Sequence, residues 1–120
     1  MKSKLFILML LLNSFSSIGS ELRCGWLQNP SPGNHWIIDK DGLWDISSQG
    51  GFIADGIDKL KDFSDKQYVK MNGGYGYGYG YGCACVKVDV DHVKKRITKV
   101  YSESILPLNR CQNDSNLHRP

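Results

Sequence analysis

Four cysteines constrain the fold of this 120-residue chain more than any other feature: Cys24, Cys83, Cys85 and Cys111. An even number in a short exported chain predicts a disulfide framework, because oxidising compartments preserve such bonds and a small core needs them. A bond between Cys83 and Cys85 is disfavoured, since side chains at positions i and i+2 of a strand project in parallel rather than converge. We therefore expect Cys24 to pair with one of these two and Cys111 with the other.

Two other uses of the cysteines fit the spacing less well. Structural zinc sites present cysteines as C-x₂₋₄-C pairs, and the C-A-C of residues 83–85 is one residue shorter than that, even with His92 as a further ligand. A redox-active C-x-C would leave a Cys24–Cys111 bridge, but it lacks the C-x-x-C spacing at a helix N-terminus that lowers a thiol pKa. The sequence predicts no metal site and no cofactor.

Residues 1–20 have the three parts of a secretory signal peptide. Lys2 and Lys4 precede an apolar run over residues 5–12, and small and polar residues follow as far as Ser20. The run is too short for a membrane-spanning helix, which needs about 20 apolar residues. We expect cleavage after Gly19 or Ser20, leaving residues 21–120 as a single small domain in the periplasm or outside the cell, without a membrane span.

The charge of the mature chain argues against a nucleic acid partner. The full sequence has 15 basic and 12 acidic side chains, and the loss of Lys2 and Lys4 with the signal leaves a net charge near zero. Proteins that grip phosphate backbones gather Lys and Arg on one surface. Here the lysines of residues 58–66 alternate with aspartates, so no basic stripe forms.

The hydrophobic pattern of the mature chain predicts a mainly β domain. An Asp-Gly turn between two β-prone runs predicts a hairpin over residues 35–46, and alternation predicts paired strands at 80–91 and 96–106. Shorter strands are expected at 50–56 and 67–71, helical turns at 57–66, a turn-rich segment at 23–34 and a polar tail at 108–117. We expect a compact antiparallel sheet of about five or six short strands with long loops, stapled by disulfides; a small α+β fold is the alternative.

A tract of four Tyr-Gly pairs precedes the paired cysteines. If this tract is extended, Tyr75, Tyr77, Tyr79 and Tyr81 share one face and glycines line the other. Such a face offers flat apolar rings with hydroxyls at their edges, which suits a sugar or a protein partner. The simpler interpretation, which we favour, is a low-complexity glycine-rich loop leading into a strand.

Tryptophans supply the other candidates for a binding surface. Trp26, Trp36 and Trp44 all lie in the first half of the mature chain. Aromatic side chains also dominate the cores of small domains, so we expect at least two of the three to be buried. The two expected bridges would tie the Trp26 segment and the polar C-terminal tail to the end of the Tyr-Gly tract, and we expect a binding surface first at that junction.

Four motifs resemble those of one family of small exported bacterial proteins. They are R-C-G-W-x-x-N-P-x-P-G-N at 23–34, D-x-D-G-x-W at 39–44, G-Y-G-C-A-C at 80–85 and P-L-x-x-C at 107–111. Together they resemble the domain of unknown function 4087 family over residues 23–117, all four cysteines included. The Tyr-Gly tract is longer here than the family pattern. The resemblance implies a bacterial source and a periplasmic or secreted location, and it implies no activity.

The residues indicate a binding module rather than an enzyme. The histidines and carboxylates fall where turns and solvated faces are expected, and no nucleophile elbow or phosphate-cradling loop is present in the sequence. We expect a periplasmic inhibitor or immunity-type protein that recognises a protein partner. The alternative is a module that binds envelope glycan or other carbohydrate, and a small thiol-redox enzyme is a more distant third.

Overall fold

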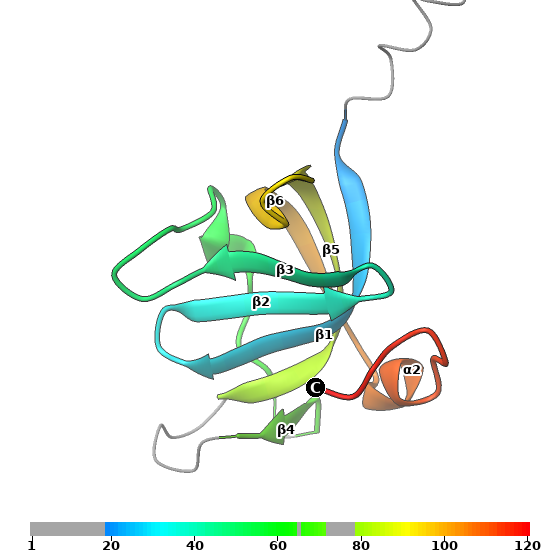
Figure 1. The fold of residues 1–120 in the computed structure, drawn as a ribbon. Helices are drawn as coiled ribbons and strands as arrows, with labels where there is room; N and C mark the ends of the chain where they lie inside the picture. The colour runs from blue at the N-terminus through cyan, green and yellow to red at the C-terminus, as the bar shows by residue number, and fades with distance from the viewer. Residues whose placement is uncertain (1–18, 65, 72–78) are drawn as a thin grey trace, which may run out of the picture.

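Six strands form one sheet in the computed structural model of the chain, which describes residues 19–64, 66–71 and 79–120 (Figure 1). The elements in chain order are β1 (Glu21–Ser31), β2 (Asn34–Asp39), β3 (Gly42–Ser47), the 3₁₀ turn η1 (Ile57–Lys59), β4 (Tyr68–Lys70), β5 (Gly80–Asp91), β6 (Arg96–Leu106) and the short helix α2 (Leu108–Gln112). No helix in these described segments is long and apolar enough to span a bilayer.

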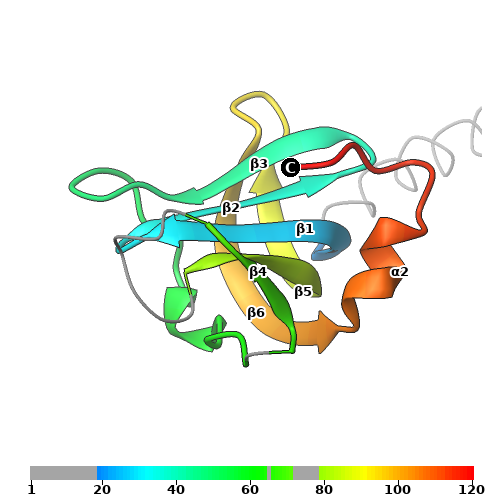
Figure 2. The same cartoon turned by 90° about the horizontal axis from the view of Figure 1, so that it is seen from below.

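Five of the strands close into a barrel. The order β1-β2-β3-β6-β5 is completed by pairing of β5 with β1, and β4 lies beside the end of β5. Strands β1, β2 and β3 form one side of the ring and β5 and β6 the other (Figures 1 and 2). The ring pairs are antiparallel except for β3 and β6, which meet in parallel at Asp45 and Arg96. This connectivity is that of an OB-fold, a five-stranded Greek-key barrel.

The barrel interior is apolar because alternate residues of each strand point inward. One inward row runs through Trp44, Ile37, Leu27 and Gly82, which face one another across β3, β2, β1 and β5. Buried members of this core are Leu27, Ile37, Trp44, Ile46, Ala54, Phe63, Ala84, Val86, Val88, Ile97 and Val100.

A second apolar cluster lies on the outside of the barrel. Trp26, Cys83 and Cys111 form its buried centre, and the packed surround consists of Ile38, Tyr81, Leu106, Leu108 and Leu117. Disulfides join Cys24 to Cys85 and Cys83 to Cys111, so each cysteine of the C-A-C segment has its own distant partner, as expected. The second bond holds α2 and the chain after it against the outer face of the sheet.

The main elements of the expected fold are confirmed. The domain is mainly β, the 35–46 segment forms the β2–β3 hairpin, and β5 pairs with β6 over the expected residues. A short β4 and one helical turn at η1 also lie where the pattern placed them. The sheet differs in being closed and mixed, because β3 and β6 run parallel where they meet.

Two local expectations were wrong. The segment rich in turn residues forms the long strand β1. The register of β1 with β2 shifts between Gln28 and Ser31, and Pro30 lies within this shift. A proline is tolerated there because no backbone N–H is needed for the ladder at that position. Residues 50–56 make only isolated bridges at Ile53 and Asp55 rather than a strand. The polar tail is tied down through Cys111 as expected, and it begins with the helix α2, which was not predicted.

The end of the Tyr-Gly tract is a strand whose glycines are sterically required. Gly80 and Gly82 face inward in β5, and a Cβ atom at Gly82 would lie 2.6 Å from both the Gln67 carbonyl oxygen and a ring carbon of Phe63. At Gly80 it would meet the Val69 carbonyl oxygen at 2.0 Å. Glycine therefore lets β4 and the chain before it pack directly on β5.

Candidate functional site

The aromatic residues singled out from the sequence are placed in two different environments. Trp44 lies inside the barrel with none of its surface exposed, whereas Trp26, Trp36 and Tyr81 project from the outer face of the sheet. Trp26 is 4% exposed, and Trp36 and Tyr81 are half-buried. Tyr79, which directly precedes β5, is also half-buried. The remaining predicted tyrosines, Tyr75 and Tyr77, lie outside the described residues.

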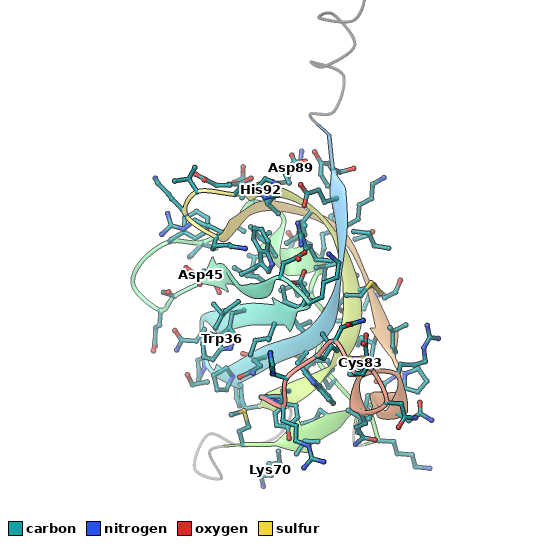
Figure 3. All side chains as sticks on the ribbon, turned by 45° about the vertical axis from the view of Figure 1, so that its right-hand side comes forward. Trp36, Asp45, Lys70, Cys83, Asp89 and His92 are labelled. Atoms are coloured by element: carbon teal, nitrogen blue, oxygen red, sulfur yellow. A yellow bond between two sulfur atoms is a disulfide. The ribbon has the colours of Figure 1, made fainter. Side chains whose placement is uncertain are left out.

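Strand register gathers Trp26, Trp36 and Tyr81 into what we call the outer aromatic face. Gln28 of β1 is directly opposite Tyr81 of β5 on one side and Trp36 of β2 on the other. Trp26 precedes Gln28 by two residues in β1, so the two side chains lie on the same face. The Trp26 ring packs edge to face against the Tyr81 ring, with 5.3 Å between the centroids. Figure 3 shows Trp36 on β2 and Cys83 beside α2.

A cavity of about 720 Å³ opens beside this face, and we call it the outer groove. One wall is formed by Trp26, Val69 and Tyr81. The other lining residues come from the end of α2 and from the chain after it, and they are Cys111, Gln112, Asn113, Asp114, Ser115, Leu117, Arg119 and Pro120. Its volume lies within the range of about 300–1,000 Å³ that is usual for small-molecule sites.

The polar wall of the outer groove is held in place by covalent and backbone contacts. Cys111 is tied to Cys83, and the N–H of Asn113 donates to the carbonyl of Asn109 at 2.9 Å. Asp114 then accepts from the N–H of Asn116 through its side chain, also at 2.9 Å. The groove lies at the junction that the cysteine spacing indicated, where the Trp26 segment and the polar tail meet the end of the Tyr-Gly tract. The individual residues of this wall were not predicted, because they carry no periodic pattern.

A different polar cluster closes the end of the barrel nearest the β5–β6 hairpin. Arg23 points inward from β1 and donates to the carboxylates of Glu21, Asp39 and Asp41, the last two at 3.0 and 2.7 Å. Its guanidinium carbon also lies 4.1 Å from the centre of the Trp44 ring. Trp44 in turn donates its indole N–H to Asp39 at 2.9 Å. This Arg23 cluster therefore joins three strands across the barrel mouth.

The charges of the Arg23 cluster satisfy one another. Burial lowers the pKa of Arg23, but its hydrogen bonds to the three carboxylates outweigh this and hold the pKa above its ordinary value. The hydrogen bond from Arg23 is the main reason that the pKa of Glu21 is lowered. Lys95 lies 4.4 Å from the Trp44 ring centre and donates to the Asp41 carbonyl. With its donors and acceptors engaged, the cluster fits a structural cap better than a binding site.

The three histidines do not form a shared site. His35 is hydrogen-bonded to Ser47 at 2.9 Å, and burial lowers its pKa. His92 lies at the barrel end opposite α2 (Figure 3), where its Nε2 is 2.6 Å from Glu21. His118 is exposed near the C-terminus. Within the described part of the chain, no group of three His, Cys, Asp or Glu side chains is arranged to hold a metal ion.

The carboxyl group of Glu103, near the C-terminal end of β6, is partly buried with only one of its oxygens hydrogen-bonded. Glu103 faces inward opposite Val86, and burial raises its pKa, although the N–H of Lys61 donates to its Oε1 at 2.9 Å. Its Oε2 is buried and lacks a hydrogen-bond partner. A raised pKa in a cleft is one mark of a catalytic acid. Glu103 does not line the outer groove.

Comparison with known proteins identifies a family and nothing finer. The model of the family described as "Protein of unknown function (DUF4087)" matches residues 18–118. No curated protein and no solved structure gives a significant match to the chain. The match spans every element of the barrel and both disulfides.

Proposed function

The chain belongs to the DUF4087 family, and we propose that it is an exported binding module whose ligand, a carbohydrate chain of the cell envelope, occupies the outer groove. The observation that carries this proposal is the pairing of an aromatic wall with a wall of short polar side chains. The outer aromatic face and the groove are continuous through Trp26 and Tyr81, which belong to both.

The chemistry of the two walls suits a sugar. A pyranose ring has an apolar C–H face that packs on an aromatic ring, and hydroxyl groups at its rim that both donate and accept hydrogen bonds. Tyr81 and Trp26 supply rings, while Asn113, Asp114 and Ser115 supply amide, carboxylate and hydroxyl groups on the other side. The OB-type connectivity adds a fold-level analogy, because some OB barrels bind oligosaccharides on their outer strands.

Export is part of the same proposal. Two disulfides are usual in proteins of oxidising compartments and rare in those kept reduced. The first strand begins at Glu21, directly after the expected cleavage position at Ser20, so removal of residues 1–20 would cost the barrel none of its strands. The sequence features of residues 1–20 support a signal peptide, although those residues lie largely outside the described structure.

The test is binding to insoluble peptidoglycan and to its soluble fragments. We expect the oxidised protein to sediment with the polymer and its tryptophan fluorescence to change on titration with fragments. Tyr81→Ala should weaken binding by about fivefold to a hundredfold, since an aromatic contact of this kind contributes roughly 1–3 kcal/mol. Tyr101→Ala is the matched control, because Tyr101 is an exposed tyrosine on β6 that does not line the groove.

A protein partner is the second candidate, favoured by an apolar row on the outer face. Cys83, Trp26, Ile38 and Leu43 face one another across β5, β1, β2 and β3, and Leu43 is 49% exposed. Cys83 and Trp26 are buried, so Ile38 and Leu43 are the part of this row that a partner could contact, and exposed apolar side chains of this kind occur in interface cores. Retention of one protein from a periplasmic extract by the oxidised domain, lost in Leu43→Asp and kept in Tyr81→Ala, would favour this candidate over the glycan.

A further inference from the structure

The two disulfides differ sharply in exposure. Cys83 and Cys111 are 1% and 4% exposed beneath α2 and the tail. Cys24 is exposed and Cys85 half-buried. We propose that the Cys24–Cys85 bond is a site of thiol–disulfide exchange, reduced by an external dithiol while the protein stays folded and Cys83–Cys111 stays intact. This inference is independent of the glycan proposal and differs from a reactive C-x-C, because Cys83 takes no part.

The strand register allows this bond to break without opening the barrel. Cys24 and Cys85 are directly opposite each other, within nine consecutive register pairs between β1 and β5. The residues on either side, from Glu21 to Asn29 of β1, remain paired whether or not the sulfurs are joined. The ladder therefore holds the two thiols of the reduced form next to each other, ready to be reoxidised. Exposed disulfides of this kind are typically the labile or regulatory ones.

A small cavity gives an incoming thiol access to the bond. It has a volume of about 240 Å³, and its lining includes Cys24, Gly25 and Cys85 together with the buried Cys83 and Cys111. Arg110 and Asp114 also line it, one charge of each sign. This opening is large enough for a cysteine side chain on an extended segment, so the substrate class is a protein or peptide dithiol or a small thiol.

The exchange is balanced as two displacements. A thiolate of the partner attacks Sγ of Cys24, the more exposed residue of the two. A mixed disulfide forms there, and the electron pair of the broken bond leaves on Sγ of Cys85. The second thiolate of the partner then attacks its own sulfur in the mixed disulfide and releases Cys24 as a thiolate. The partner dithiol is oxidised to a disulfide, Cys24 and Cys85 are reduced, and they take up the two protons that the partner lost.

Limited reduction under native conditions tests the proposal. The oxidised protein is treated with reduced glutathione, quenched with N-ethylmaleimide, digested and mapped by mass. We expect glutathione on Cys24, alkylation of Cys85 and an intact Cys83–Cys111 bond, with the first disulfide lost at least about tenfold faster than the second. The near-UV circular dichroism of the singly reduced protein should remain that of a folded domain.

Two double variants keep the outcome interpretable. Cys83→Ser with Cys111→Ser should leave the reduction rate of Cys24–Cys85 nearly unchanged, and Cys24→Ser with Cys85→Ser should leave a bond that resists glutathione. Equal rates for the two bonds, first loss of Cys83–Cys111, or reduction only after denaturant is added would each overturn the proposal. Glutathione found on Cys85 instead would overturn the assignment of Cys24 as the attacked sulfur.

Discussion

The interior of the barrel and its outer aromatic face contain the same aromatic residue types in different environments. Trp44 inside is fully buried, bonded to Asp39 and flanked by Arg23 and Lys95. Trp36 outside is half-buried, and Trp26 and Tyr81 border an open groove. The difference teaches that tryptophan content alone does not mark a binding surface. The parity of each residue in its strand decides which face it joins.

Breaking the Arg23 cluster should have the largest effect on stability. Arg23→Leu removes the cation that faces the side chain of Asp39, which is only 4% exposed. The Asp39 carboxylate then stays buried without a positive charge to balance it. We expect a loss of about 2–4 kcal/mol in the free energy of unfolding, measured by urea denaturation. Arg119→Leu on the groove wall should change stability by less than about 0.5 kcal/mol. Equal losses would contradict the division between the two regions.

Replacing each tryptophan by phenylalanine should destabilise the protein more in the barrel interior than on the outer aromatic face, and it has the next largest expected effect. Trp44→Phe removes buried ring volume and the hydrogen bond to Asp39, so we expect a loss of about 2–3 kcal/mol in thermal or urea unfolding. Trp36→Phe keeps most of a half-buried contact and should cost less than about 1 kcal/mol. If Trp36→Phe were the more destabilising change, the outer face would be part of the core rather than a binding surface.

The glycines of β5 should tolerate a methyl group poorly. Gly82→Ala places a Cβ atom against the backbone of Gln67 and the ring of Phe63, so β4 must move away. We expect a loss of about 1–3 kcal/mol. Gly51→Ala is the matched control, because its nearest neighbours would lie at 3.6 Å or beyond and it should change stability by less than about 0.5 kcal/mol. A neutral Gly82→Ala would show that β4 is not packed on β5.

The smallest effect concerns the pH dependence of stability. Burial raises the folded-state pKa of Glu103. The contribution of this group to the free energy of unfolding is therefore present at low pH and is lost as the pH rises through that pKa. Glu103→Gln should therefore stabilise the protein at pH 7, by less than about 1 kcal/mol, and have little effect near pH 3. Glu21 has a lowered pKa, so Glu21→Gln should destabilise at pH 7 and not at pH 3. The same sign for both variants would contradict these assignments.

Local patterns were sufficient to predict most of the barrel strands. The alternation of Val86 and Val88 and the Asp-Gly turn before Leu43 depend on neighbours a few residues away, and both hairpins formed as expected. Strand β1 was missed because Pro30 and Pro32 indicate turns, and its pairing with β5 is a contact between segments about sixty residues apart. Barrel closure depends on such distant pairings, which local periodicity does not reveal.

The candidate site was predicted by residue type but not by arrangement. Trp26, Trp36 and Tyr81 were all singled out, yet nothing in the sequence separated them from Trp44. The two groups differ only in register, since Trp36 pairs across from Gln28 and Trp44 across from Ile37. The cysteine spacing indicated that the polar tail meets the Trp26 segment, but the individual residues from Gln112 to Ser115 that line the groove were not predicted, because only the fold defines which of them face it.

The indole N–H signals of the three tryptophans test the central claim most directly. A titration of ¹⁵N-labelled oxidised protein with peptidoglycan fragments, followed by NMR, reports each ring separately. We predict that the signal of Trp26, which lines the groove, shifts most, that the signal of Trp36 beside the groove shifts less along the same saturation curve, and that the signal of Trp44, bonded to Asp39 inside the barrel, stays in place. Unchanged Trp26 and Trp36 signals, or a shift confined to Trp44 and the β5–β6 hairpin, would contradict binding at the outer aromatic face.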